Sequence, residues 1–236
     1  MNSLCFKFLT FLISATFLGP CYAEMAAFSE GSARFSQGQI EENHLVGKIV
    51  EGRYFSGDGL FSVEVPSAIN HSGYIEDHAV SGNLAGVAFF NDYGYLLKVE
   101  TDETPAEVAF LISHHPEIKE EILDALFFDV LIPQLKESIP NLKVLHKTKI
   151  VLDNKEPALF VVLDMPQAST IVNSQTRMPL DSKRGFIIYF SKNTYLVNFS
   201  MQDTLTLLPS VAEAAKLRLN ERLLTHMLES QRTYKN

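Results

Sequence analysis

A run of polar side chains between residues 67 and 83 carries the groups best suited to chemistry in this 236-residue chain. It contains His71, Tyr74, Glu76, Asp77 and His78. Imidazole and carboxyl groups are the usual general acids and bases, and functional groups favour loops. The segment predicts a binding site, with an exported hydrolase acting through residues 71–78 as the alternative. The plainer interpretation is a solvated connection between hairpins.

A second polar segment covers residues 166–184 and is rich in hydroxyl and amide side chains. Asn173, Gln175 and Arg177 lie near its middle. Hydrogen-bonding groups of this kind suit recognition better than bond-breaking chemistry. A loop of this length in a compact domain is either functional or mobile, so we expect a recognition loop or a mobile connection.

The pair His114 and His115 is the third candidate. On a continuous helix His114, Glu117 and Glu121 would share one face and offer a nitrogen and two carboxylates to a metal ion. Pro116 interrupts such a helix, so we expect no metal site. The motifs G-x-S-x-G, H-E-x-x-H, G-x-G-x-x-G and G-x-x-x-x-G-K-[ST] are all absent from the sequence. We therefore assign no catalytic residue and expect no cofactor.

Short strands joined by turns dominate the pattern around these segments. Alternation of apolar and polar residues and intervening turn residues predict four hairpins. Their strands are Leu45–Phe55 with Leu60–Val65, Gly86–Phe90 with Tyr95–Thr101, Leu142–Leu152 with Ala158–Met165, and Gly185–Phe190 with Tyr195–Met201. Hairpin connections imply a largely antiparallel sheet.

Three helices are expected between and after these hairpins. Thr104-Pro105-Ala106-Glu107 resembles a capping box and predicts a short helix toward Ser113. A longer helix runs from Pro116 to about Ile139, with Pro133 expected to kink or end it. Apolar residues at helical spacing predict a last helix over 209–230. The fold class is α+β in the order ββββα-ββββα, with the sheet covered by the long middle helix and the C-terminal helix.

The first 23 residues have the pattern of a cleavable signal peptide. Lys7 precedes an apolar stretch of about 12 residues, and small residues precede a cleavage point after Ala23. Residues 24–43 are then expected to form a flexible lead-in, and residues 44–236 a single domain. Lipid attachment at Cys21 is the alternative, although Pro20 does not suit a lipobox. Both cysteines, Cys5 and Cys21, lie in the segment that cleavage removes.

The net charge of the chain limits the classes of partner that we expect it to bind. The full chain has 20 Lys and Arg against 28 Asp and Glu, and residues 1–23 contain one lysine and no acid, so the mature chain carries a net charge of −9. A field of that sign repels phosphate backbones, and nucleic-acid binding is not expected. No window after residue 23 predicts a transmembrane span.

The order of elements, with FSVEVP at Phe61–Pro66 as its first clear strand, resembles the PsbP-like α/β/α fold. That group includes extrinsic photosystem subunits, Ran-binding Mog-type proteins and DcrB-like envelope proteins. The resemblance covers about residues 45–230 in pattern and carries over no functional residue. It implies a non-enzymatic accessory or binding role.

These observations predict an exported protein, periplasmic or secreted after cleavage near Ala23. We expect a non-enzymatic accessory protein that binds a partner protein or an envelope component. Its candidate binding residues are His71, Tyr74, Glu76, Asp77, His78, Asn173, Gln175 and Arg177. The hydrolase acting through residues 71–78 and a carrier of a small apolar ligand between helix and sheet remain alternatives.

Overall fold

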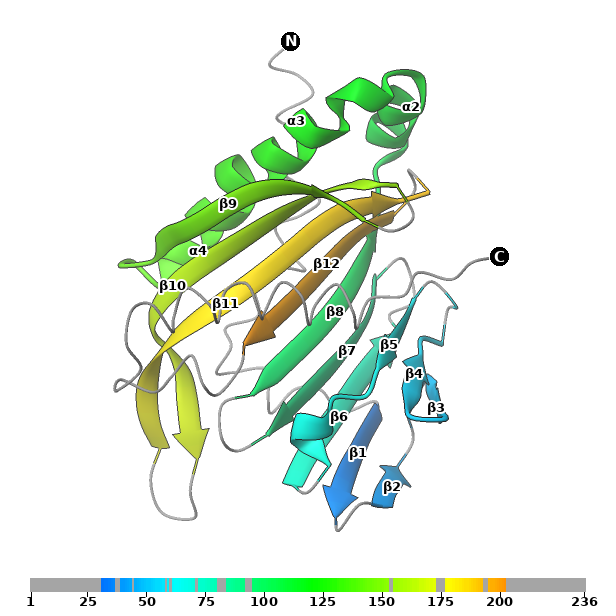
Figure 1. Cartoon of the computed structure of the whole chain (residues 1–236), viewed down its shortest axis with the longest axis vertical. Helices are drawn as coiled ribbons and strands as arrows, with labels where there is room; N and C mark the ends of the chain where they lie inside the picture. Colours follow the sequence, from blue (N-terminus) through cyan, green and yellow to red (C-terminus); the bar gives the residue numbers. More distant parts are fainter. Residues whose placement is uncertain are drawn as a thin grey trace.

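The computed structural model describes residues 31–36, 39–43, 45–57, 59, 61–70, 72–79, 84–91, 95–152, 155–172, 177–192 and 195–202. These residues form a mixed α+β fold in three layers. A nine-stranded sheet lies in the middle, with helices on one face and a small three-stranded sheet on the other (Figure 1). The predicted α+β class is confirmed.

Every neighbouring pair in the large sheet is antiparallel. Its order is β2-β1-β6-β7-β8-β12-β11-β10-β9. The strands are β1 (Gly31–Ser36), β2 (Gln39–Asn43), β6 (Ser72–Ala79), β7 (Leu84–Asn91), β8 (Leu96–Glu103), β9 (Lys143–Val151), β10 (Pro157–Val172), β11 (Arg177–Ser191) and β12 (Tyr195–Gln202). Between β8 and β9 the chain crosses over through the helices, and it then returns strand by strand until β12 pairs with β8.

The small sheet contains β3 (Lys48–Val50), β4 (Arg53–Phe55) and β5 (Ser62–Glu64). Glu51 and Gly52 form the turn between β3 and β4, both at positive φ, which a glycine adopts without steric cost. Ser56 closes the next turn, because its hydroxyl accepts from the Phe61 amide at 3.1 Å and donates to the Phe61 carbonyl at 3.0 Å. A 3₁₀ turn, η2 (Ser67–Ile69), then leads into β6.

The helical layer is almost continuous from residue 106 to residue 138. It consists of α2 (Ala106–His114), η3 (Pro116–Ile118), α3 (Lys119–Ala125), the π-helical segment η4 (Leu126–Leu131) and α4 (Ile132–Ser138). Pro133 was predicted to kink or end the long helix; the helix continues past it but is distorted immediately before it. The chain widens into π geometry immediately before it, and Ile132 donates to the Phe127 carbonyl five residues back. A wider turn at this place accommodates a residue that has no N–H and would crowd a regular helix.

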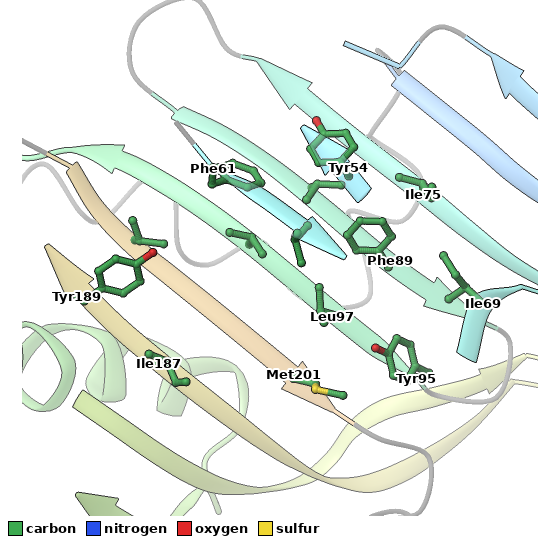
Figure 2. Packing of buried hydrophobic residues seen from close by; sticks show 14 of the residues in the cluster. Tyr54, Phe61, Ile69, Ile75, Phe89, Tyr95, Leu97, Ile187, Tyr189 and Met201 are labelled. Atoms are coloured by element: carbon green, nitrogen blue, oxygen red, sulfur yellow. The ribbon is translucent and has the colours of Figure 1, made fainter. Parts of the chain in front are cut away.

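A large apolar cluster fills the space between the two sheets. Tyr54 and Phe61 from the small sheet meet Ile75, Phe89 and residues of the central strands, as Figure 2 shows. The rings of Tyr54 and Phe89 lie edge to face, with centroids 6.1 Å apart. Burial of so many large side chains is the main force holding the small sheet in place.

A second cluster lies on the opposite face, beneath the helices. Phe127 and Leu123 from the helices pack on side chains of β10 and β11 such as Leu159 and Phe186. The start of α3 is also tied to the turn between β9 and β10, because Lys119 forms a 2.6 Å ion pair with Glu156. The described helices therefore cover the β10–β11 part of this face.

Several sequence predictions about the strands are wrong. In the part of the chain that the structure describes, eight strands rather than four precede the helices. The predicted lead-in of residues 24–43 contributes β1 and β2 to the large sheet, while residues 24–30 lie outside the described part. The predicted strand Leu45–Phe55 is a hairpin of its own, and the expected loop 67–83 contains β6.

The expected loop 166–184 is also wrong, since most of it belongs to β10 and β11. Beyond Asp164 and before Gly185 these two strands pair only with each other among the described residues, so they extend past their neighbours. A shift in register between Met165 and Ser169, with Gln167 at a φ of 57°, marks the start of the extension. The segment contains so many polar residues that the alternation of apolar and polar residues typical of a strand cannot be recognised in it.

The helix predictions fare better. The predicted middle helix is confirmed over Pro116–Ser138. The capping box predicted for the shorter helix α2 is not formed, because Pro105 rather than Thr104 directly precedes α2 and no side chain caps it. The predicted signal peptide and the helix over 209–230 lie outside the described residues. No helix in the described part of the chain is both long and apolar enough to cross a membrane.

Candidate functional site

Asp77 was a candidate for chemistry, and the structure gives it a structural role. It lies on β6 and is 1% exposed. Its carboxylate accepts hydrogen bonds from the amides of Val46 and Gly47, at 3.0 and 2.7 Å, and from the Tyr54 hydroxyl at 2.8 Å. Three donors from the small sheet and the chain leading into it converge on one side chain of the large sheet. Asp77 therefore fastens the two sheets together.

The approach of Gly47 to this carboxylate leaves no space for a side chain. A Cβ atom at Gly47 would collide with the Phe55 carbonyl and the Tyr54 ring. A glycine is thus required where the chain enters the small sheet, because only the bare backbone can come this close. The three hydrogen bonds and the close approach of Gly47 account for the burial of Asp77 at this place.

Glu76, the neighbour of Asp77, faces the other side of the large sheet. Successive residues of a strand point to opposite faces. Glu76 of β6 pairs with Ala88 of β7, which pairs with Lys98 of β8. Lys98 in turn pairs with Ser200 of β12, which pairs with Phe186 of β11. Phe186 belongs to the cluster under the helices, so this row of side chains lies on the helix-bearing face. The two acids of the predicted hydrolase site are therefore separated by the sheet.

Partial burial changes the proton affinity of Glu76. Loss of solvent around the carboxyl raises the pKa of Glu76 from 4.5 to about 7. A carboxyl group with such a pKa is present in both protonation states near neutral pH. It can donate a hydrogen bond as well as accept one.

A set of polar side chains on the helix-bearing face forms the candidate site. A second row, next to the first, places Gly86 beside Glu100 and Glu100 beside Asn198. We call the following residues of strands β6, β8 and β12 the polar face: Glu76, Lys98, Glu100, Asn198, Ser200 and Gln202. Lys98 and Glu100 form an ion pair of 2.6 Å within it.

Burial distinguishes the polar face from an ordinary solvated strand surface. Glu100 and Asn198 are each 5% exposed, and Ser200 and Gln202 are buried as well. The Asn198 Oδ1 atom is buried and has no hydrogen-bond partner in the described part of the chain. Burial of an acceptor that has no hydrogen-bond partner costs about 1–3 kcal/mol.

Tyr74 lies at one end of this face. Its ring is stacked on that of Phe90, with centroids 5.4 Å apart and planes at 20°. The Arg34 guanidinium lies 5.6 Å from the Tyr74 ring centroid. Tyr74 is two residues from Glu76 on the same strand, so the aromatic pair and the polar face share one side of the sheet.

The other predicted site residues are not brought together. His71, Asn173 and Gln175 lie outside the described residues. His78 lies on β6 opposite Gly86, and Arg177 begins β11 opposite Val172, with neither side chain described. Of the candidates from residues 67–83, Tyr74 and Glu76 lie on the side of the sheet that carries the polar face, and Asp77 lies on the opposite side.

The His114 and His115 pair stays at the surface. His114 Nδ1 lies 2.9 Å from the Phe110 carbonyl, and His115 Nδ1 lies 3.2 Å from Glu117. A backbone hydrogen bond and, to a smaller extent, His115 lower the pKa of Glu117. No group of three or more His, Cys, Asp or Glu side chains suited to a metal ion occurs among the residues that the structure describes.

Five residues of the polar face were missed from the sequence. Lys98, Glu100, Asn198 and Ser200 alternate with apolar residues in two predicted strands, and Gln202 directly follows the second of them. That alternation is typical of a solvated outer face, and only the pairing of β8 with β12 across about 100 residues brings them together. The available signal was the alternation itself, which does not reveal burial.

Comparison with known proteins adds little to this description. No protein-family model matches the chain, and no curated protein matches its sequence. Among solved structures, the chain is similar to the crystal structure of the protein of unknown function PA94 from Pseudomonas aeruginosa. The two are 11% identical, the match covers 82% of this chain and 100% of PA94, and the TM-score is 0.30.

Proposed function

We propose that this chain is an exported, non-enzymatic accessory protein of the cell envelope that binds a partner protein or an envelope component at the end of the polar face where Tyr74 and Glu76 lie. The observation that carries the proposal is that Tyr74 and Glu76 are only half-buried, at one end of the otherwise buried set of polar side chains. The PsbP-like resemblance and the signal-peptide pattern agree with this role.

Export is tested by expressing the full chain in its native host and measuring the mass of the mature N-terminus. A free Glu24 in the periplasmic or secreted fraction supports the proposal, and a lipid-modified Cys21 would instead indicate anchoring. Retention of residues 1–23 on a cytoplasmic protein would contradict it.

Binding is tested by affinity capture from the native envelope with the processed chain and two variants. We expect Tyr74→Ala to lose the captured component, because the variant removes the half-exposed ring next to Glu76. Glu64→Gln, at an exposed position of β5, is the matched control and should capture as well as the wild type. Equal capture by all three proteins would exclude the polar face as the binding surface.

An exported hydrolase is the second candidate, and one observation favours it. The raised pKa of Glu76 suits a general acid near neutral pH. Asp77 does not supply the partner carboxylate, because it lies on the opposite face and accepts three hydrogen bonds there. Hydrolysis that is lost in Glu76→Gln and kept in Glu64→Gln would support the enzyme.

A further inference from the structure

Strand β9 forms one edge of the large sheet (Figure 1). Among the described residues only β10 pairs with it, and the first five residues of the strand, 143–147, are all exposed. The strand contains no proline, and none of its residues has a positive φ. A regular edge strand of nine residues presents a row of backbone N–H and C=O groups with which a further strand can pair.

Exposed apolar side chains are concentrated on this edge. Val144 and Leu145 are 41% and 42% exposed, and Val151 is 69% exposed. Six large apolar side chains are exposed in the described part of the chain, and three of them therefore belong to this one strand. Apolar side chains in water beside an open backbone edge favour pairing with another strand.

The lysines of β9 do not block this edge. A lysine on an edge strand usually opposes association, because pairing would bring its charge beside another strand. Here Lys147 forms an ion pair of 2.6 Å with Asp124, and its ammonium group lies 4.2 Å from the centroid of the Phe128 ring. Lys149 forms an ion pair of 2.7 Å with Glu120. Both lysines are thus held toward the helices, and an acidic strand of another protein would have to compete with Asp124 and Glu120.

The register of β9 on β10 shows which side chains of β9 share a face. Directly paired residues of antiparallel strands lie on the same side of a sheet. The pairs are Val144 with Leu163, Lys147 with Val161, Lys149 with Leu159 and Val151 with Pro157. Leu163, Val161 and Leu159 belong to the cluster under the helices. The helix-bearing side of β9 therefore carries Val144, Lys147, Lys149 and Val151 in that order, with Leu145 as an extra residue at the shift in register.

This order of valine, lysine, lysine and valine reads the same in both directions. A two-fold axis requires such a pattern, because both copies use the same patch in opposite directions. If a second β9 pairs antiparallel across an axis at Thr148, Val144 lies opposite Val151 of the second copy, and Lys147 lies opposite its Lys149. The exposed valines then cover each other at both ends. The lysines meet in the middle, each beside the acid of α3 with which it is already paired.

We infer that this chain forms a two-fold dimer in which the large sheet continues from β9 of one copy into β9 of a second copy. The inference goes beyond the proposed function and uses a different part of the molecule, because β6 lies six strand positions from β9 in the sheet. The dimer presents the surface at Tyr74 and Glu76 twice. A partner with repeated sites would engage both copies and be held more tightly than by one copy.

Disulfide trapping tests the position of the axis. Cys5→Ser and Cys21→Ser first remove the natural thiols from the full chain, and Thr148→Cys is then added. The two copies of residue 148 face each other across the axis with Cα atoms about 4.5–5.5 Å apart, which is within the range of a disulfide. We expect a covalent dimer under mild oxidation. Glu64→Cys, at an exposed position of β5, is the control and should stay monomeric. Equal cross-linking of the two variants would overturn the inference.

Sedimentation equilibrium of the chain without added cysteines measures the non-covalent dimer. We expect a Kd of about 10–100 µM, since one strand pair is a small interface. Val151→Lys should raise this Kd at least about tenfold, because it replaces an apolar contact by a cation beside four lysines. Val50→Lys, at a valine of β3 that is 45% exposed, is the matched control and should leave the Kd unchanged. A monomer at every concentration, or wild-type dimerisation of Val151→Lys, would contradict the dimer.

The dimer and the proposed binding surface are tested separately. Tyr74→Ala should lose the captured envelope component and keep the wild-type Kd of the dimer. Val151→Lys should still capture the component as a monomer. Urea unfolding curves show that each variant is folded at the assay temperature. If Tyr74→Ala disrupts the dimer as strongly as Val151→Lys does, the interface is not at β9.

Discussion

Removal of the Asp77 carboxylate should detach the small sheet from the large one. Asp77→Ala leaves the buried Tyr54 hydroxyl and two backbone amides without their acceptor. The Tyr54 phenol is fully buried, so leaving its hydroxyl without an acceptor lowers the free energy of unfolding by about 1–3 kcal/mol. The amides of Val46 and Gly47 are only partly buried and can bind water in the variant, at about 0.5–1 kcal/mol each. The expected loss in the free energy of unfolding is about 2–5 kcal/mol.

Two milder substitutions divide this loss into parts. Tyr54→Phe removes one hydrogen bond and should cost about 1–2 kcal/mol. Asp77→Asn keeps one oxygen, which can still serve Gly47 and Tyr54, but it presents an NH₂ group to the Val46 amide. We expect Asp77→Asn to fall between Tyr54→Phe and Asp77→Ala.

The assay is urea denaturation followed by circular dichroism, with midpoint and slope fitted for each protein. Asp77→Ala in the Tyr54→Phe background should cost about 1 kcal/mol less than in the wild type, because the shared bond is already absent. Glu64→Gln, at an exposed residue of β5, is the control and should change stability by less than about 0.5 kcal/mol.

A loss of less than about 1 kcal/mol for Asp77→Ala would show that the carboxylate does not hold the two sheets together. Strict additivity of Asp77→Ala and Tyr54→Phe would also contradict it, since the two residues would then not interact. If Asp77→Ala does not fold, the order of Tyr54→Phe and Asp77→Asn still decides the matter. Asp77→Asn should be the less stable of those two.

Three further substitutions test other parts of the structure. The pKa of Glu76 is raised from 4.5 to about 7, so the folded chain holds this proton more tightly than the unfolded chain does. The free energy of unfolding of the wild type should therefore fall by about 1–2 kcal/mol between about pH 4.5 and 8, relative to that of Glu76→Gln. Parallel pH profiles of the two proteins would contradict this expectation. Gly73→Ala places a Cβ against Ile69 and should cost about 2–3 kcal/mol in urea unfolding, whereas a neutral result would mean that η2 can move aside. Lys119→Met removes the ammonium partner of Glu156 and should cost about 1–2 kcal/mol, and that cost should largely disappear when Glu156→Gln is also present.

The fold class could be predicted from local patterns because those patterns are repeated many times. Strand alternation and turn residues predicted the hairpin β7–β8 and strand β9 close to their observed positions, and they predicted where β10 begins. The long helix was visible from its apolar spacing, and even Pro133 did not remove it. Strands rich in polar residues, β1, β2 and β6, were read as loops, because their signal comes from cross-strand partners that are distant in sequence.

The candidate site was predictable only in part. Tyr74, Glu76 and Asp77 were selected by residue type, yet alternation along β6 sends Asp77 to one face and Glu76 to the other. Once β6 had been read as a loop, this separation could not be seen. The polar face could not be predicted at all, because it depends on which of twelve strands pair with β8 and β12.

The sequence by itself determined the charge and the thiol content of this chain, the α+β class and the expectation of a signal peptide. Those properties depend on composition or on patterns within about 20 residues. Only the tertiary structure decided that Asp77 fastens two sheets together and that Lys98, Glu100, Asn198 and Ser200 share a buried face. Burial and unsatisfied hydrogen bonds are properties of the packed whole, since they depend on which distant segments exclude water from a side chain.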